Sequence, residues 1–227
     1  MKAIVLAGGR GQRLQPLTLD RPKCLVEVAG KSIAQRQLEW LAGEGVDEVI
    51  FSCGYRWEMI RQAIGDNAFG MLVRYAPEEQ PLGRGGGLRH ALSQLQLGAD
   101  PVVALNGDVL TRLQLADMAA QHQAAAALAT LLLVPYVSQH GIVDLGEDDR
   151  VVGFREKPRL PYWLSGGVYL LSPAIRELLP ERGDHETTTW PELARQGRLH
   201  GYRFEGFWRS LDSAKDVAEA EAALSSR

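Results

Sequence analysis

The chain has 227 residues, of which 45% are hydrophobic and 23% are charged, a composition typical of soluble globular proteins. The formal net charge of −3 gives no support for nucleic acid or an anionic membrane as a partner. The two cysteines, Cys24 and Cys53, form neither a disulfide framework nor a metal motif, which indicates buried thiols in a reducing compartment. The length suits one α/β domain with a substantial core, or two small domains.

Two apolar segments of the chain, at its start and at 124–134, are not predicted to be membrane segments. The start MKAIVLA is too short for a secretory signal peptide. The apolar run 124–134 is shorter than the roughly 20 residues that a membrane span requires. We therefore expect no membrane partner.

Strands and helices are expected to alternate along the first half of the chain. Apolar runs predict strands at 2–7, 48–53, 71–76, 101–106 and 128–134. Apolar residues at three-to-four spacing predict helices at about 33–43, 56–64, 86–96 and 113–122. This alternation is typical of a doubly wound, mostly parallel α/β sheet, in which ligands bind beyond the carboxyl ends of the strands.

The second half of the chain is richer in predicted strands. They fall at 141–145, 151–155, 165–171 and 199–204, and a helix at about 213–224 follows. We expect these strands to extend the sheet and to add a small β-rich subregion for a second substrate.

A glycine-rich loop directly follows the first predicted strand. It contains Gly8, Gly9 and Gly11 together with Arg13, and Lys23 follows a short distance later. Glycines let backbone N–H groups approach a phosphate closely, and the basic side chains supply positive charge. The pattern favours an anion site, with a tight turn carrying exposed arginines as the alternative.

Two better-known glycine-rich signatures do not fit this loop. The P-loop string G-x-x-x-x-G-K-[ST] does not occur in the sequence. The dinucleotide pattern G-x-G-x-x-G fails because Leu14 occupies its third glycine position. Together with the missing ribose-binding carboxylate, this disfavours a dinucleotide-dependent oxidoreductase.

Five motifs, in the same order along the chain, resemble those of the sugar nucleotidyltransferases, also called nucleotide-sugar pyrophosphorylases. They are LAGGRGQRLQPLTLDRPKCLVEVAGKSI at 6–33, PLGRGGGLRHAL at 81–92, LNGDVL at 105–110, FREKP at 154–158 and SGGVYLLSP at 165–173. The first motif departs from the family pattern at Gln12, Cys24 and Ser32, none of which carries the charge chemistry. The resemblance implies a Rossmann-like nucleotidyltransferase domain over 1–227, with a nucleotide-binding half at about 1–110 and a sugar-phosphate-binding half at about 111–227.

The reaction that the resemblance implies joins a nucleoside triphosphate to a sugar 1-phosphate and releases pyrophosphate, with Mg²⁺ as cofactor. Mannose-1-phosphate guanylyltransferases are the favoured comparison, with GDP-mannose or GDP-heptose as product. The motif CGY at 53–55 and the Trp208–Asp212 spacing instead resemble glucose-1-phosphate cytidylyl- or thymidylyltransferases, and GGG at 85–87 resembles N-acetylmuramate-1-phosphate uridylyltransferases. A non-catalytic nucleotide-sugar-binding regulatory subunit is an alternative of another class. A cytoplasmic location follows from the family, and a homodimer is compatible with it.

The same resemblance assigns roles to individual residues. Arg13, Lys23 and Asp108 are the implied catalytic residues. The implied nucleotide-binding residues are Leu6, Ala7, Gly8, Gly9, Gly11, Glu78 and Gly83. The implied sugar-phosphate-binding residues are Asn106, Gly141, Glu156, Lys157 and Gly167. Glu78 could accept hydrogen bonds from a guanine base, or it could be a solvated loop charge.

Two carboxylates are the candidate ligands of Mg²⁺. Asp108 follows a predicted strand in Asn-Gly-Asp, a sequence that is also typical of turns. The family's second metal-binding aspartate aligns with Ser210, and Asp212 follows two residues later, on the same face of an extended strand. Asp212 is therefore the second candidate, and the alternative is that it caps the helix that begins near residue 213.

Overall fold

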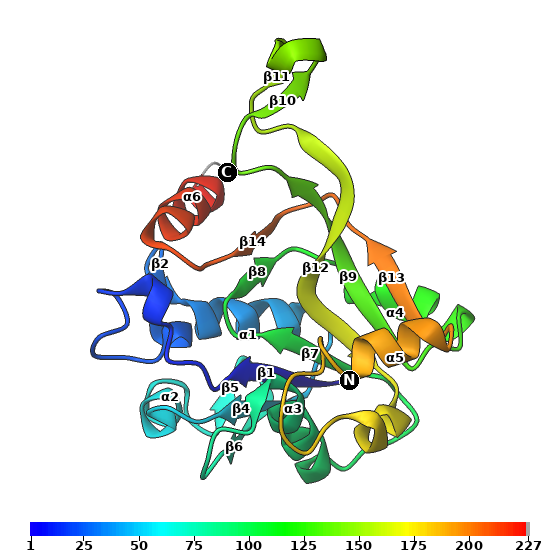
Figure 1. Ribbon diagram of the computed structural model, residues 1–227. Helices are drawn as coiled ribbons and strands as arrows, with labels where there is room; N and C mark the ends of the chain where they lie inside the picture. The colour runs from blue at the N-terminus through cyan, green and yellow to red at the C-terminus, as the bar shows by residue number, and fades with distance from the viewer. Residues whose placement is uncertain (226–227) are drawn as a thin grey trace.

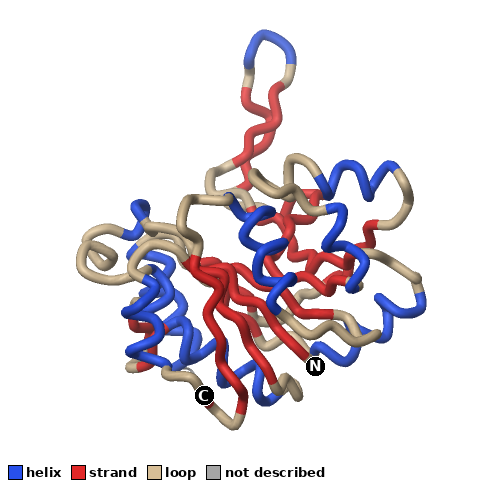
Figure 2. The backbone as a smooth tube through the Cα atoms, turned by 90° about the horizontal axis from the view of Figure 1, so that it is seen from below, coloured by secondary structure: helices blue, strands red, loops and turns tan. Residues whose placement is uncertain are grey.

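Eight strands form one twisted sheet with helices on both faces in the computed structural model, which describes residues 1–225 (Figures 1 and 2). The strand order is β13-β9-β12-β7-β1-β4-β6-β5. These strands are β1 (Lys2–Ala7), β4 (Glu48–Cys53), β5 (Asn67–Ala68), β6 (Met71–Pro77), β7 (Val102–Asn106), β9 (Ala129–Val137), β12 (Arg159–Leu171) and β13 (Leu199–Arg203). β12 and β5 run opposite to the other six, so the predicted mostly parallel α/β sheet is confirmed.

The helices of the described residues are α1 (Ile33–Gly43), α2 (Trp57–Ile64), α3 (Gly83–Gln94), α4 (Leu115–Ala124), α5 (Thr189–Arg195) and α6 (Ala214–Ser225). The first five divide between the two faces of this sheet, whereas α6 packs beside it against Leu14, Val28 and Leu110. Side chains alternate along β1, so Ala3 and Val5 pack with α1, α2 and α4, whereas Ile4 packs with α3 and α5. The expected doubly wound arrangement is therefore present. Within residues 1–225, no helix is long and apolar enough to cross a membrane.

Three short strand pairs lie outside the main sheet. They are β2 (Glu27–Val28) with β3 (Lys31–Ser32), β8 (Val109–Thr111) with β14 (Trp208–Ser210), and β10 (Ile142–Leu145) with β11 (Val151–Arg155). The pair of β8 and β14 was not predicted, because three-residue strands carry no readable alternation. It nevertheless brings the C-terminal segment next to the end of β7.

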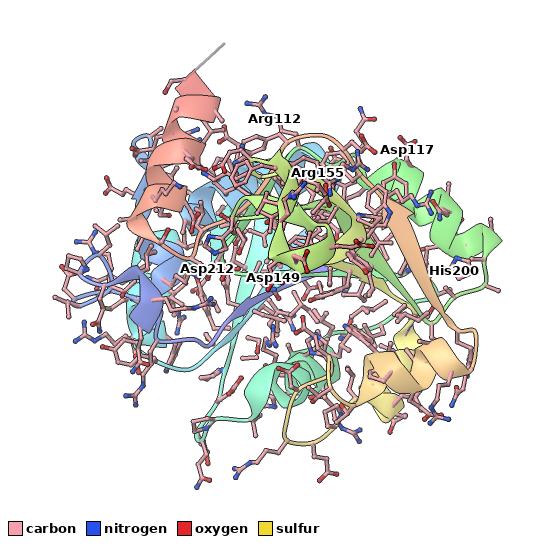
Figure 3. All side chains as sticks on the ribbon, turned by 45° about the horizontal axis from the view of Figure 1, so that its top comes forward. Arg112, Asp117, Asp149, Arg155, His200 and Asp212 are labelled. Carbon is pink, nitrogen blue, oxygen red and sulfur yellow. The ribbon has the colours of Figure 1, made fainter. Side chains whose placement is uncertain are left out.

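Of the four strands expected to extend the sheet and add a small β-rich subregion, 165–171 and 199–204 join the sheet in β12 and β13, whereas 141–145 and 151–155 do not. These strands pair only with each other among the described residues, as a hairpin that lies at the top of Figure 1, away from the main sheet. Asp149 and Arg155 mark this hairpin in Figure 3. Its apolar side chains are exposed, Phe154 by 65% and Val152 by 64%, so alternation alone could not distinguish it from a buried strand pair.

Helix α3 begins at Gly83 rather than at the predicted residue 86. Glycine disfavours helices, so the sequence does not mark where the helix begins within a run that contains Gly83, Gly85, Gly86 and Gly87. Close packing explains the difference, since a methyl group on Gly86 would lie 2.5 Å from the Glu181 carbonyl oxygen. Only glycines allow the helix to approach that segment so closely.

Candidate active site

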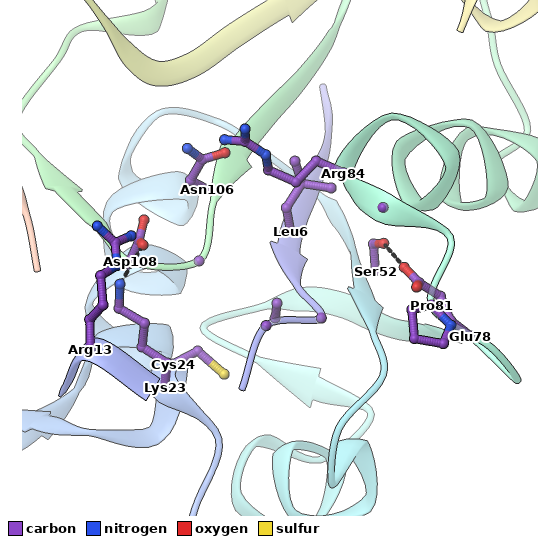
Figure 4. A pocket seen from close by; sticks show the side chains of 15 residues that line it. Leu6, Arg13, Lys23, Cys24, Ser52, Glu78, Pro81, Arg84, Asn106 and Asp108 are labelled. Carbon is purple, nitrogen blue, oxygen red and sulfur yellow. Dashed lines mark hydrogen bonds and ion pairs between the residues drawn. The ribbon is translucent and has the colours of Figure 1, made fainter. Parts of the chain in front are cut away.

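A cavity of about 480 Å³ opens at the carboxyl ends of β1 and β7 (Figure 4). The Gly107 N–H donates to the Leu6 carbonyl at 2.9 Å, which joins the ends of the two strands. The residues that line the cavity are Leu6, Ala7, Gly8, Gly9, Arg13, Lys23, Cys24, Ser52, Glu78, Pro81, Gly83, Arg84, Asn106, Gly107 and Asp108. The glycine-rich loop and the Asn-Gly-Asp turn therefore meet at one edge of the sheet, as expected.

Lys23 bridges the two candidate metal-binding carboxylates. Its Nζ lies 2.6 Å from Asp108 Oδ2 and 2.8 Å from Asp212 Oδ1. Arg13 Nη2 lies 2.9 Å from the same Asp212 oxygen. The Lys23 side chain is 14% exposed, so most of it is removed from water. Two carboxylates and two cations thus converge from four separate segments of the chain.

Asp212 is directed to this cluster and does not cap α6. The cap is Ser213, whose Oγ accepts from the Asp216 N–H at 3.3 Å, while the Asp216 carboxylate accepts from the Ser213 N–H at 2.7 Å. This reciprocal pair is a capping box. The alternative prediction, in which Asp212 itself is the cap, is therefore wrong. Figure 3 labels Asp212 at the start of α6.

The pKa of Asp212 is lowered from its ordinary value of 3.8. Burial alone would raise this pKa, but the hydrogen bond from Lys23 and the charges of Lys23 and Arg13 outweigh it. Ser210 contributes in the same direction, since its Oγ donates to Asp212 Oδ2 at 3.3 Å. The ionised carboxylate is thus the favoured form at this position.

The carboxylates fit a magnesium ion, which prefers oxygen ligands and is commonly held by one or two carboxylates together with water and phosphate oxygens. Both are already turned toward one positive charge, the ammonium group of Lys23. Within residues 1–225, no group of three or more His, Cys, Asp or Glu side chains could hold a metal ion. Asp108 and Asp212 are the residues that would hold Mg²⁺ here.

Glu78 lies in the wall of the cavity and is tied to the start of α3. Its Oε2 accepts from the Leu82 N–H at 2.9 Å, and its Oε1 lies 3.4 Å from Ser52 Oγ. A methyl group on Gly87 would lie only 2.4 Å from Glu78 Oε1, so the backbone approaches this carboxylate closely there. A methyl group on Gly8 would lie 3.6 Å from the same oxygen, which is ordinary contact. These contacts favour a fixed wall residue over the alternative of a freely solvated loop charge.

Gly11 is not among the residues that line the cavity, but it packs against Lys23, which does line it. Its φ is +63°, and a methyl group there would lie 2.9 Å from Lys23 Cβ and 3.0 Å from Thr18 Cγ2. Glycine is required for both reasons, the left-handed backbone and the close approach. The contact holds Lys23 Cβ against the glycine-rich loop.

The five predicted sugar-phosphate residues fall into two groups. Asn106 lines the cavity, and Gly167 lies against it, since a methyl group on Gly167 would be 2.6 Å from Asn106 Nδ2. The other three lie at the base of the β10–β11 hairpin and are not among the lining residues. There, a methyl group on Gly141 would be 3.1 Å from Glu156 Oε2, and Lys157 has a φ of +44°.

Arg84 is a cavity residue that the sequence did not single out. Its guanidinium lies 2.5 Å from Asp184 Oδ2 and 2.6 Å from Glu186 Oε2, so it joins α3 to the segment before α5. The available signal was its place in PLGRGGG, where the family pattern has threonine. Its two acidic partners are about 100 residues away in sequence, so their contact could not be read from the motif.

Comparison with known proteins identifies the family of the chain. The family model described as nucleotidyl transferase matches residues 2–227. A mannose-1-phosphate guanylyltransferase catalytic subunit beta from Dictyostelium discoideum is 33% identical over 224 residues, which cover 95% of this chain and 62% of that protein. A mannose-1-phosphate guanylyltransferase from Mycobacterium tuberculosis is 32% identical over 231 residues, covering 98% and 64% of the two chains. The chain therefore spans less than two thirds of the length of these relatives.

Among solved structures, HddC from Yersinia pseudotuberculosis complexed with GMP-PN has a similar fold. The TM-score is 0.78 at 23% sequence identity, and the match covers 98% of this chain and 99% of that one. The match of the family model over nearly the whole sequence and the shared fold lead to one conclusion. The chain belongs to the nucleotidyl transferase family.

Proposed function

We propose that this protein transfers a nucleotidyl group from a nucleoside triphosphate to a sugar 1-phosphate, releasing pyrophosphate and forming a nucleotide-sugar. GTP is the proposed donor, and mannose 1-phosphate or a heptose 1-phosphate is the proposed acceptor, so the product is GDP-mannose or GDP-heptose. The observation that carries the proposal is the bridge from Lys23 to Asp108 and Asp212 beside the glycine-rich loop. The guanylyltransferase relatives support the choice of substrates.

In this reaction an oxygen of the sugar phosphate attacks the α-phosphorus, and the bond from that phosphorus to the bridging oxygen of the pyrophosphate breaks. The attacking oxygen is already anionic, so the site needs no general base, and positioning and charge neutralisation dominate. Lys23 and Arg13 supply positive charge to the phosphates. A Mg²⁺ ion bound by Asp108 and Asp212 would supply further neutralisation of phosphate charge.

The remaining assignments complete the proposal. Leu6, Ala7, Gly8, Gly9, Gly11, Glu78 and Gly83 form the nucleotide site, and Asn106, Gly141, Glu156, Lys157 and Gly167 form the sugar-phosphate site. The nucleotide site belongs to a half at about 1–110 and the sugar site to a half at about 111–227 of one nucleotidyltransferase domain. We also propose a cytoplasmic homodimer, a state that light scattering of the purified chain would test.

A matrix of nucleoside triphosphates against sugar 1-phosphates, scored by pyrophosphate release, tests the proposal directly. GTP with mannose 1-phosphate or a heptose 1-phosphate should give the highest kcat/KM, and excess chelator should abolish the release. CTP or dTTP with glucose 1-phosphate, or UTP with N-acetylmuramate 1-phosphate, are the competing pairs. Absence of pyrophosphate with every pair would favour a non-catalytic regulatory subunit.

A further inference from the structure

A buried amide on α1 contacts the turn that carries Asp108. Gln37 Nε2 lies 2.9 Å from the Asn106 carbonyl oxygen and 2.8 Å from the Val109 carbonyl oxygen. The residue is 1% exposed. Its amide group thus donates both hydrogens, one to each of the two carbonyl groups that flank Gly107 and Asp108.

The orientation of this amide follows from its neighbours. Both nearby backbone groups are carbonyls, which accept hydrogen bonds, so the amide nitrogen and not the oxygen must face them. Gln37 Oε1 is buried and has no hydrogen-bond partner among the described residues. An unpaired buried oxygen is unfavourable, so the two donated hydrogen bonds are what hold the side chain in place.

The rest of the turn is fixed from two other sides. The Gly107 N–H donates to Leu6 O at 2.9 Å, and the Leu211 N–H donates to Asp108 O at 3.0 Å. In an antiparallel pair, successive carbonyls point to opposite sides, so Val109 O faces away from β14. The amide of Gln37 is the group that meets it there.

We propose that Gln37 is a positioning residue, which fixes the Asn106–Val109 turn so that the Asp108 carboxylate meets Lys23 and Asp212. The two hydrogen bonds that Gln37 donates go to backbone carbonyls and not to Lys23 or the two carboxylates, so it acts through the backbone of the turn. The kinetic consequence of this role rests on the proposed function. The rigidity of the turn does not, and it can be measured without substrate or metal.

Hydrogen exchange of single amides, measured by NMR, tests the role directly. Gln37→Met has a side chain of similar length without a donor, so the Gly107 and Leu211 amides should exchange faster than in the wild-type chain. The matched control is Trp40→Phe, which removes a hydrogen bond from the same helix to Leu113 O at 2.9 Å, beyond the turn. Unchanged exchange at both amides, or equal acceleration in the control, would overturn the proposal.

Kinetics give a second readout. Gln37→Met should lower kcat about 10- to 100-fold, as expected for a small displacement of a reacting group. The Mg²⁺ concentration needed for half-maximal rate should rise, while KM for the triphosphate stays unchanged. A wild-type kcat and Mg²⁺ requirement would contradict the role. If the wild-type chain releases no pyrophosphate, the proposed function fails, and hydrogen exchange still decides the role of Gln37.

Should Gln37→Met not fold, Gln37→Asn replaces it in both experiments. The shorter amide cannot reach both carbonyls, so the same acceleration at Gly107 and Leu211 is expected. Wild-type exchange in a folded Gln37→Asn chain would likewise overturn the proposal.

Discussion

Ser210 Oγ donates to Asp212 Oδ2 across 3.3 Å, so the serine at the end of β14 contacts the carboxylate two residues later. Asp212 is the residue before the Ser213 cap of α6. Its other oxygen remains free to meet Lys23 at 2.8 Å and Arg13 at 2.9 Å. Asp212 therefore adds a second negative charge to the cluster, beside that of Asp108.

Asp212→Asn keeps the shape of this side chain and removes its charge. Because Ser213 caps α6, the helix should be unaffected, whereas turnover should fall and the apparent Mg²⁺ requirement should rise. Pyrophosphate release measured across a Mg²⁺ titration checks this expectation. The control is Ser213→Ala, which should cost about 1 kcal/mol of stability without changing the Mg²⁺ requirement. A silent Asp212→Asn would leave Asp108 as the single carboxylate in the proposed metal site.

Lys23→Ala removes the charge that joins the two carboxylates. We expect turnover to fall by about 10²–10³-fold, the usual effect of losing one group that stabilises transition-state charge. Circular dichroism should show an intact fold. Lys31→Ala is the matched control, because Lys31 pairs with Glu39 on the surface at 2.7 Å, and its loss should leave turnover unchanged. Equal turnover in the two variants would reduce Lys23 to a structural ion-pair partner.

The lowered pKa of Asp212 makes part of the stability dependent on pH. A carboxyl group with a lower pKa in the folded state stabilises that state when ionised. This contribution is fully present above the ordinary pKa of 3.8 and is lost as the pH falls through the lower folded value. In urea unfolding, the wild-type advantage over Asp212→Asn should be present at about pH 7 and shrink as the pH falls below 3.8. A difference that grows on acidification would show the opposite shift.

The two cysteines should resist thiol reagents while the chain is folded. Burial raises the pKa of Cys24 to about 12, and burial followed by the charge of Glu78 raises the pKa of Cys53 to about 12. The thiolate is the reactive form, so Ellman's reagent at about pH 8 should detect neither thiol in the native protein. Both should react after unfolding in guanidinium. Rapid labelling of a native thiol would mean that the cavity wall at Cys24 opens.

The central cluster could be predicted because its parts follow strands. The glycine-rich loop that leads to Arg13 follows β1, and Asp108 follows β7 by two residues. The carboxyl ends of these neighbouring parallel strands share an edge. Lys23 was identified by its place in the family motif, and the structure brings its ammonium group to both carboxylates. Local order along the chain and one topological rule therefore place the glycine-rich loop and Asp108, whereas Lys23 and Asp212 needed the resemblance to the family as well.

Other parts of the site depend on contacts that no local pattern records. Gln37 is one polar residue on a helix, and its partners lie 69 and 72 residues away. The partners of Arg84, Asp184 and Glu186, lie even farther away, at 100 and 102 residues. The hairpin of β10 and β11 has the alternation of a sheet strand pair but leaves its apolar side chains exposed. In each case the tertiary arrangement, which sequence spacing does not encode, decides the outcome.

The glycines at the start of α3 also link the two parts of the chain that the motifs separate. Gly85 N–H donates to Gly183 O at 2.9 Å, and a methyl group on Gly85 would lie 2.7 Å from the Pro180 ring. In addition, β12 pairs with β7. The outer edge of β7, which ends the group of N-terminal strands, is therefore covered by a strand from the C-terminal part of the chain. A chain cut near residue 110 would expose an unpaired strand edge, which promotes aggregation. The two fragments should therefore regain a native fold only when they are produced together, as partners in a split-protein complementation assay.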